Sequence, residues 1–446
     1  MKKQLMMFGS VLVFVVMSAV LMPSAYATNG MNLEGYGPIA TGMGGASMAY
    51  DNGVAAVMNN PATLGLMPEG DRLDVAIGML GPNIMAESGG AEAKSSANAF
   101  FMPAFGWAKK AGAMTYGVGM FSQGGMGTEY DANSLMDGGG SGKKVRSELG
   151  VGRVIVPLAY NVTPALTIGG SLDYVWASLD LKMAVPGSTF FSMITNCSGP
   201  ACAGLGPIAA APWTRLDFSD SSDFSGAAKG TGFGGKLGIT YKVNSDVSVG
   251  AVYHSKTSLS DLETKANGAD ISASGMGTVG TGKISVRDFQ WPETYGIGVA
   301  WNANKELQIV ADIKRINWSD VMKSFNMTYE GPLAGAPGNT VDFAMLQNWK
   351  NQTVYELGVA YKVSEPLILR AGFNLSNNPI PDTYLNALFP ATIKNQYTVG
   401  AGYMVSKASS VDFSYTYAPE VKQTNGQGVT VAHSQTNAQL MYSYRF

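Results

Sequence analysis

Charged residues are scarce in this sequence of 446 residues, and the two signs nearly balance. Asp, Glu, Lys and Arg make up 14% of the chain, against about 25% in ordinary soluble domains. The formal net charge of −2 gives no electrostatic reason to expect a nucleic-acid partner. After Met22, no uninterrupted apolar run reaches the roughly 18 residues that a membrane-spanning helix needs. The composition therefore fits neither an ordinary soluble domain nor a helical membrane protein.

Residues that carry catalysis or bind metals are also few. The chain has two histidines, His254 and His433, and we expect both on the surface or in an aromatic girdle. Ser255 follows His254, but neighbours in a strand point to opposite faces, so they form no nucleophile and base pair. No group of Cys, His and carboxylate residues has the spacing of a metal site. The sequence therefore predicts no enzyme, no metal and no cofactor.

The N-terminus has the order of residues typical of export. Lys2 and Lys3 precede an apolar run from Leu5 to Met22, and a small-residue exit ends at Ala27. This order predicts a signal peptide over residues 1–27, with an uncleaved membrane anchor as the alternative. Because an exported protein leaves the reducing cytoplasm, we expect Cys197 and Cys202 to form a disulfide, the alternative being a reduced pair without a role.

Alternating polarity runs through the rest of the chain. In the stretch LTIGGSLDYVWASL, Leu166, Ile168, Leu172, Tyr174 and Trp176 alternate with small or polar residues. A strand between lipid and a lumen must alternate in this way, because successive side chains point to opposite faces. A half-buried strand of a soluble sandwich gives the same pattern. The number of strands and their connections must therefore decide between the two.

Strands of this kind repeat from Arg72 to the end of the chain. We count about fourteen, joined alternately by short turns such as NVTPA (161–165) and by long segments, which predicts an all-β transmembrane barrel of about 14 antiparallel strands. Trp176, Trp301 and Trp318 lie near predicted strand ends, where an aromatic girdle is expected. The last strand ends on Phe446, and this ending resembles the C-terminal strand by which the barrel-insertion machinery recognises bacterial barrel proteins.

The stretch before the first strand, GPIATGMGGASMAYDNGVAAVMNNPATLGLM (37–67), is apolar but built from small residues. It has too few bulky side chains to form a core of its own. A barrel of about fourteen strands leaves a lumen, and small residues allow close backbone contact with its wall. We therefore predict that residues 28–70 form a hatch that plugs the lumen of a barrel spanning residues 71–446.

At this point the sequence resembles the FadL/TodX family of outer-membrane transporters for long-chain fatty acids and aromatic hydrocarbons. The resemblance rests on GMGGASMAYDNGVAAVMNNPATL and on later stretches such as FSQGGMGTEY and QNWKNQTVYELGVAYKV, and it covers the mature chain. It implies that Gly44, Gly45 and the Asn60-Pro61-Ala62 motif belong to the hatch. It also implies sideways release through a gap at a kinked third strand, here the Gly-rich stretch 116–127.

Two long extracellular loops are expected, at about 184–228 and 257–283. The first is unusually apolar for a loop facing water, and exposed apolar surface of this kind tends to mark a binding site. The resemblance likewise implies a groove that captures substrate, for which we select Phe190, Phe191, Met193 and Trp213. The alternative is that these side chains only pack the loop into a lid.

Passive transport of a hydrophobic molecule across the bacterial outer membrane is the function we predict. A general polar porin is the first alternative, although it has no use for a plugged bore, and a lipid-acting barrel enzyme is the second. The expected surroundings are outer-membrane lipids and lipopolysaccharide, with the protein as a monomer. Fatty-acid carriers of the family resemble one another in holding the carboxylate with an Arg and a Lys. Lys350 matches the lysine but Met183 stands at the arginine position, which favours neutral hydrocarbons over fatty acids.

Overall fold

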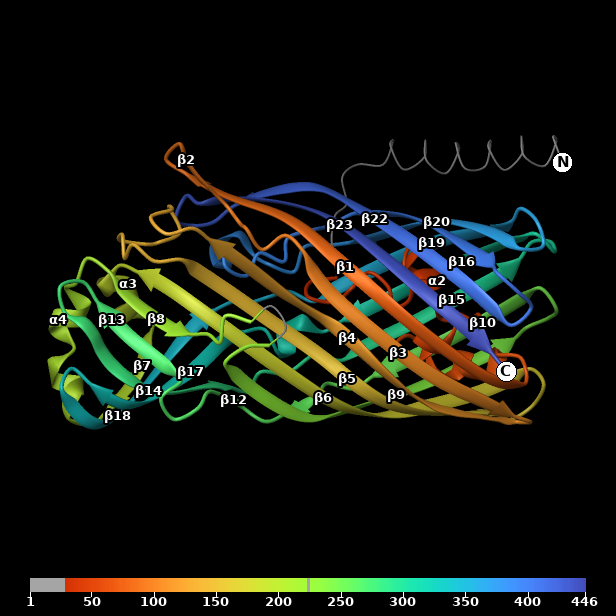
Figure 1. Ribbon diagram of the computed structural model, residues 1–446, viewed down its shortest axis with the longest axis horizontal. Coiled ribbons are helices and arrows are strands. Elements are labelled where there is room, and N and C mark those ends of the chain that lie inside the picture. The colour runs from red at the N-terminus through yellow and green to blue at the C-terminus, as the bar shows by residue number, and fades with distance from the viewer. Residues whose placement is uncertain (1–28, 223–224) are drawn as a thin grey trace.

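The computed structural model describes residues 29–222 and 225–446. The predicted signal peptide, residues 1–27, lies outside the described residues. The described chain forms one elongated barrel with strongly tilted strands, and its helices are short (Figure 1). No helix in these two ranges is long and apolar enough to cross a membrane.

Antiparallel pairing closes the sheet on itself. Strand β23 pairs with β1 from Arg72 opposite Arg445 to Glu87 opposite Thr430. The strands of the closed circuit, in the order in which they pair, are β1 (Gly70–Ser88), β3 (Phe100–Ala111), β4 (Met114–Tyr130), β5 (Val145–Asn161), β6 (Leu166–Val185), β9 (Ala228–Lys242), β10 (Val247–His254), β15 (Thr294–Asn302), β16 (Leu307–Ile316), β19 (Gln352–Lys362), β20 (Leu367–Ser376), β21 (Gln396–Met404), β22 (Ser409–Thr424) and β23 (Thr430–Arg445).

The predicted total of about fourteen strands is wrong, because the described chain forms one sheet of 23 strands. The additional strands are β2 (Ala91–Lys94), β7 (Ile194–Ser198), β8 (Thr214–Phe218), β11 (Ser258–Leu259), β12 (Leu262–Glu263), β13 (Ala269–Ala273), β14 (Gly277–Arg287), β17 (Ser324–Leu333) and β18 (Ala336–Leu346). Most of them lie in segments that the sequence assigned to long loops. Several are covered on both faces, as β8 is, so they lack the alternating polarity by which we counted strands.

In the strands of the closed circuit, successive side chains alternate between the outer and the inner face of the barrel, as predicted. In β6, Leu172 is 62% exposed on the outer face while Asp173 is fully buried on the inner face. Val75, Ile77, Leu237 and other large apolar residues are likewise exposed outward. An apolar outer face over a polar inner face is the arrangement that a lipid bilayer requires of a closed barrel.

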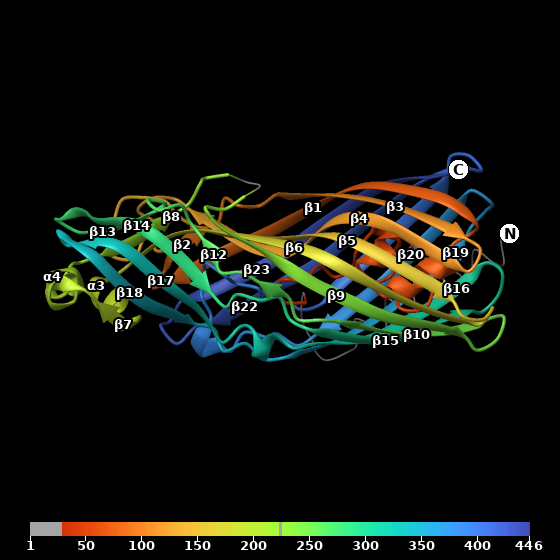
Figure 2. The same ribbon diagram turned by 90° about the horizontal axis from the view of Figure 1, so that it is seen from below.

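The N-terminal segment, residues 29–69, runs inside the barrel. It contains the short helices α2 (Pro38–Thr41), η1 (Val54–Val57) and η2 (Pro61–Leu66). Both views show it enclosed in the half of the barrel that carries the C-terminus (Figures 1 and 2). The other helices are α3 (Gly187–Ser192), η3 (Pro200–Gly204), α4 (Gly206–Ala209), η4 (Trp318–Asp320) and η5 (Asp382–Tyr384). Of these, α3 and α4 lie with β13 and β18 at the opposite end, where the long connections are.

Candidate functional site: an internal segment, a cavity and a gap in the wall

Glycines of the barrel wall let the N-terminal segment approach the strands. A Cβ added to Gly238 would lie 2.0 Å from Asn60 Oδ1, and one added to Gly250 would lie 1.9 Å from the Met48 carbonyl oxygen. Contacts this short are not possible for a Cβ, so a side chain at either position would displace the segment. The absence of side chains at these wall positions therefore makes the close contact possible.

Asn60 joins the segment to the wall and to itself. Its fully buried side chain donates from Nδ2 to the carbonyl oxygens of Met48 at 2.8 Å and Ile239 at 3.3 Å. Its Oδ1 accepts a hydrogen bond from the Ala62 amide at 3.1 Å, which caps helix η2, and Pro61 occupies the first turn of that helix. One amide group thus bonds two carbonyl groups and one helix-end donor of the buried segment and wall.

Gly44 and Gly45 form a tight turn against strands β20 and β21. Their φ angles are 73° and 90°, a region that favours glycine. The Gly44 amide donates to Thr398 Oγ1 at 2.9 Å, and its carbonyl accepts from Asn374 Nδ2 at 3.1 Å. A Cβ on Gly44 would lie 2.2 Å from the Phe373 carbonyl oxygen. The structure thus places both glycines where the segment touches the wall.

Carboxylates of the wall bind backbone amides of the segment. Asp312 accepts from the amides of Ser47 at 2.6 Å and Met48 at 3.1 Å. Asp74 accepts from the Val54 amide at 2.8 Å and pairs with Arg72, also at 2.8 Å. Hydrogen bonds to ionised acceptors are roughly twice as strong as neutral ones. The segment is therefore held by charge-assisted bonds as well as by packing.

A cavity of about 370 Å³ lies beside the start of the segment, between it and the strands β1, β3, β4 and β5. Its apolar lining includes Met31, Leu80, Ile84, Phe100, Phe101, Met126, Leu149, Val151 and Trp176. Its polar lining includes Glu34, Glu148, Gln435 and His433. Among the described residues that line it there is no lysine or arginine. The cavity lining is thus mostly apolar, and Glu148 on it is paired with Arg146.

The cavity opens through the barrel wall beside β4. Pairing between β3 and β4 ends at Ala104 opposite Phe121, although β4 continues to Tyr130. The β4–β5 register shifts between Ser122 and Gly124, and Gly124, which pairs with Val151 of β5, also forms a β-bridge with Asn32 of the segment. A Cβ on Gly124 would lie 2.0 Å from the Met31 carbonyl oxygen.

Residues from both faces of the wall meet at this gap. By the alternation of each strand, Leu80 and Leu149 face inward, whereas Phe101 and Gly150 face outward, and all four line the same cavity. The part of the Gly-rich stretch that lines the cavity, Ser122 and residues 124–127, therefore lies where inner-face and outer-face residues meet.

The long loop after β6 carries four of the predicted substrate-binding residues, but they do not line the cavity. Phe190 is buried and packs on Phe343 with ring centroids 5.9 Å apart, whereas Phe191 is 48% exposed. Met193 and Trp213 are half-buried. The predicted apolar patch is thus divided: Phe190 packs the loop, as the alternative held, and Phe191 remains exposed.

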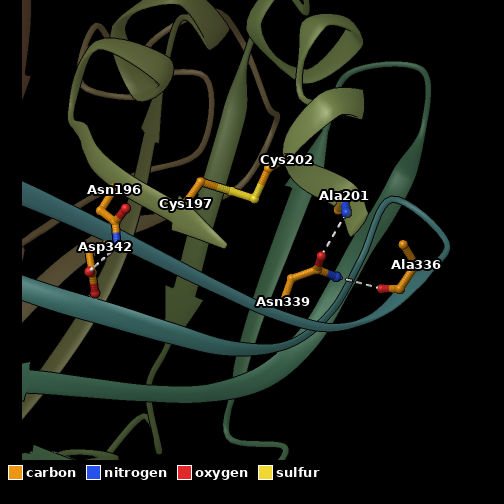
Figure 3. Close-up of a disulfide and its surroundings, with 7 residues drawn as sticks. All are labelled: Asn196, Cys197, Ala201, Cys202, Ala336, Asn339 and Asp342. Carbon is orange, nitrogen blue, oxygen red and sulfur yellow. Dashed lines mark hydrogen bonds between the residues drawn. A yellow bond between two sulfur atoms is a disulfide. The ribbon is translucent and has the colours of Figure 1, made fainter. Parts of the chain in front are cut away.

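Hydrogen bonds and pairing with β7 hold this loop to β18, and a disulfide closes a turn within the loop. Cys197 and Cys202 are bonded, with Cα atoms 5.8 Å apart. Asn339 accepts from the Ala201 amide at 2.7 Å, and Asn196 donates to Asp342 at 3.2 Å (Figure 3). These contacts order the loop that follows β6. We call its described residues 186–222 the loop cap.

Met183 and Lys350 do not form a carboxylate site. Met183 is buried opposite Leu216 in the β6–β8 pairing, away from the cavity lining. Lys350 is exposed, and its backbone amide donates to the Pro379 carbonyl oxygen at 2.7 Å. The structure does not bring these two residues together at the cavity.

Of three residues expected on the surface or in a girdle, His433 and Trp318 are buried and His254 is half-buried. His254 Nε2 lies 2.8 Å from the Asn59 carbonyl oxygen, and His433 Nδ1 lies 2.8 Å from that of Pro390. Trp318 is fully buried against Trp291, with centroids 5.5 Å apart. Their polar ring atoms suggested an interface, but each finds a hydrogen-bond partner inside the barrel.

Sequence reasoning also missed the cavity lining, which is assembled from distant strands and has no local motif. The Gly-rich stretch was its one detectable signal.

A closed barrel with an apolar outer face, an internal segment and an apolar cavity open through its wall defines the class of outer-membrane channels for hydrophobic compounds. The family described as outer membrane protein transport protein (OMPP1/FadL/TodX) matches residues 14–444, and the chain belongs to it. This is a family of transport channels and not of enzymes, and its place is the bacterial outer membrane.

Solved structures and curated relatives agree with this family. The toluene transporter TodX of P. putida is 31% identical, with a TM-score of 0.83 over 93% of this chain and 99% of that chain. The CymD monoaromatic hydrocarbon channel is 26% identical, with a TM-score of 0.75 over 93% and 99%. Outer membrane protein P1 of Haemophilus influenzae is 24% identical over 68% of this chain. The chain spans less than two thirds of the length of the curated relatives that it matches, 62% in the case of protein P1.

Proposed function

We propose that this protein carries neutral hydrophobic molecules, with monoaromatic hydrocarbons as the best-supported class, passively across the outer membrane. The observation that carries the proposal is the charge of the cavity lining, which offers Glu34 and Glu148 but no cation in the described chain. A buried substrate carboxylate would need pairing to offset its desolvation, and no described lining residue is a lysine or arginine that could pair with it. Apolar contact stabilises a hydrocarbon by about 25 cal/mol per Å² removed from water. An apolar cavity of about 150 Å³ is enough to hold benzene.

The route that we propose has four steps. Phe191 and its neighbours on the loop cap capture the molecule, and the cavity then binds it. The N-terminal segment acts as the hatch, residues 28–70, and its start shifts where Asn32 pairs with Gly124. The molecule leaves sideways through the gap at β4 into the membrane. Support for this last step comes from the mixed lining of the gap, which includes Phe101 and Gly150 of the outer face.

We also propose the surroundings of the barrel. Outer-membrane lipids and lipopolysaccharide would contact the apolar outer face, and the protein would act as a monomer. Phe446, which is 64% exposed and stacks on Tyr444 with centroids 5.6 Å apart, would present the C-terminal strand to the insertion machinery.

The decisive experiment is a binding titration of the purified protein with matched neutral and anionic ligands. Toluene is compared with benzoate, and a long-chain fatty acid with its hydrocarbon analogue, in the wild type and in Lys350→Met. We expect tighter binding of the neutral member of each pair and no effect of the substitution. A strong preference for the acids that Lys350→Met abolishes would show that the hydrocarbon assignment is wrong.

A further inference from the structure

The segment between β20 and β21 enters the barrel mouth instead of forming an open loop. We call residues 378–393 the mouth strap. Its side chains are buried at Leu385, Leu388, Phe389 and Ile393. Phe389 packs on Phe325 of β17 with ring centroids 5.1 Å apart. The strap thus forms part of the barrel's core at the end with the long connections.

Side chains from distant strands hold the strap by its carbonyl groups. Tyr130 donates its hydroxyl to the Ala387 carbonyl oxygen at 2.9 Å, and Thr128 donates to that of Leu388 at 3.3 Å. On the other side, Gln423 donates to the Ile380 carbonyl oxygen at 3.0 Å. The first two donors stand on β4 and the third on β22, so the strap is held across the mouth.

The strap also closes the cavity on the side away from the N-terminal segment. Pro390 and Ala391 line the cavity together with His433, which binds the Pro390 carbonyl oxygen. The opposite part of the lining is residues 30–34 of the N-terminal segment. The cavity therefore lies between two pieces of chain that are not strands of the wall. On the proposed route, a molecule coming from the loop cap would pass the strap to reach the cavity.

We propose that the mouth strap is the size-selecting entrance to the cavity, and that substrate passes when residues 385–391 shift from the wall. This inference rests on the proposed function. Within the described strap, residues 385–391 belong to no strand, and the contacts that hold them to the wall are side-chain hydrogen bonds and packing. Such contacts are exchanged without breaking the sheet. A constriction made by Leu388 and Phe389 would admit narrow apolar molecules more readily than wide ones.

A tether across the base of the strap tests this proposal. A Cβ added to Gly426, in the turn between β22 and β23, would lie 3.9 Å from Thr383 Cα. Both positions are exposed, and this spacing suits a disulfide. The variant is Thr383→Cys with Gly426→Cys, prepared oxidised and reduced. The two single variants and the wild type, under the same oxidant and reductant, control for the native disulfide Cys197–Cys202.

We expect oxidation of the double variant to lower toluene uptake by about tenfold or more and reduction to restore it, because gating motions set the rate of access. A second variant, Tyr130→Phe with Thr128→Val, should loosen the strap and raise uptake of naphthalene relative to toluene. Normal uptake by a fully cross-linked, folded double variant would overturn the entrance role, as would unchanged selectivity in the loosened variant. Wild-type toluene binding, measured in parallel, tests the proposed function separately.

Discussion

Replacing Asn60 by leucine is the sharpest test of how the N-terminal segment is held. Leucine has a similar size but neither donates nor accepts hydrogen bonds. The change removes the two bonds from Nδ2 to the carbonyls of Met48 and Ile239 and the bond from the Ala62 amide to Oδ1. The partners are buried and would be left without these bonds. No strand pairing of the barrel involves Asn60, so the barrel itself should remain intact.

The expected loss is in the free energy that holds the segment docked inside the barrel. Each net hydrogen bond contributes about 1 kcal/mol, and a buried group left unsatisfied costs more. Three bonds therefore correspond to about 3 kcal/mol, or roughly a hundredfold shift from docked towards undocked segment. Since residues 30–34 of the segment line the cavity, the shift should also weaken toluene binding and reduce uptake.

Limited proteolysis and uptake measure the two effects. Asn60→Leu should make the segment cleavable while the barrel keeps its heat-modifiable migration on gels. The matched control is Asn59→Leu, because the Asn59 side chain donates to the Tyr36 carbonyl oxygen and to Asn52 within the segment, and not to the wall. A segment in Asn60→Leu that resists protease as the wild type does, with unchanged uptake, would refute the reasoning.

Three further predictions follow from the same structure. Phe191→Ser should lower uptake at low substrate concentration but not at saturation, whereas Phe190→Ser should loosen the loop cap by about 3 kcal/mol, seen as protease sensitivity of the loop. Burial raises the pKa of Glu34, so docking of the segment should be strongest below the usual carboxyl pKa and should weaken as the pH rises through the raised pKa. Limited proteolysis at several pH values should show this weakening, and Glu34→Gln should remove the pH dependence. Gly150→Leu should narrow the gap, because an added Cβ there meets no atom within 4 Å, and lower uptake by about tenfold, or about 1.4 kcal/mol in the barrier, with toluene binding in detergent little changed.

The closed barrel could be predicted from the sequence because its signal is local. Apolar and polar residues alternate within each membrane-facing strand, so Leu172 and Asp173 identify the outer and inner faces without any tertiary information. The short strands in the long connections after β6 and β10 could not be counted in this way. In β8 and β13 most residues are buried on both faces, and a short strand without alternation reads as an irregular segment.

The candidate site was accessible to sequence reasoning only where one stretch of chain holds the signal. Asn60 and Gly44 stand in a recognisable motif, and the structure places both against the wall. Lys350 is exposed and does not line the cavity, and its position next to a strand end gave no indication of where its side chain would lie. The mouth strap gave no signal, since its buried residues are held by donors such as Tyr130 that lie more than 250 positions away in the chain.

The glycines of the wall show why such a segment must accompany this barrel. Gly250, Gly358 and Gly372 stand on three different strands. A Cβ added to any of them would lie 2.4 Å or less from a backbone atom or Cβ of the N-terminal segment. An open, water-filled lumen would gain nothing from glycine at these positions, where strand propensity disfavours it. Their loss of strand stability is offset only when another backbone fills the space. Inward-facing glycines on several strands of a predicted barrel therefore indicate an internal segment, and substituting Gly250 by alanine should expel Met48 from the wall while leaving the strands paired.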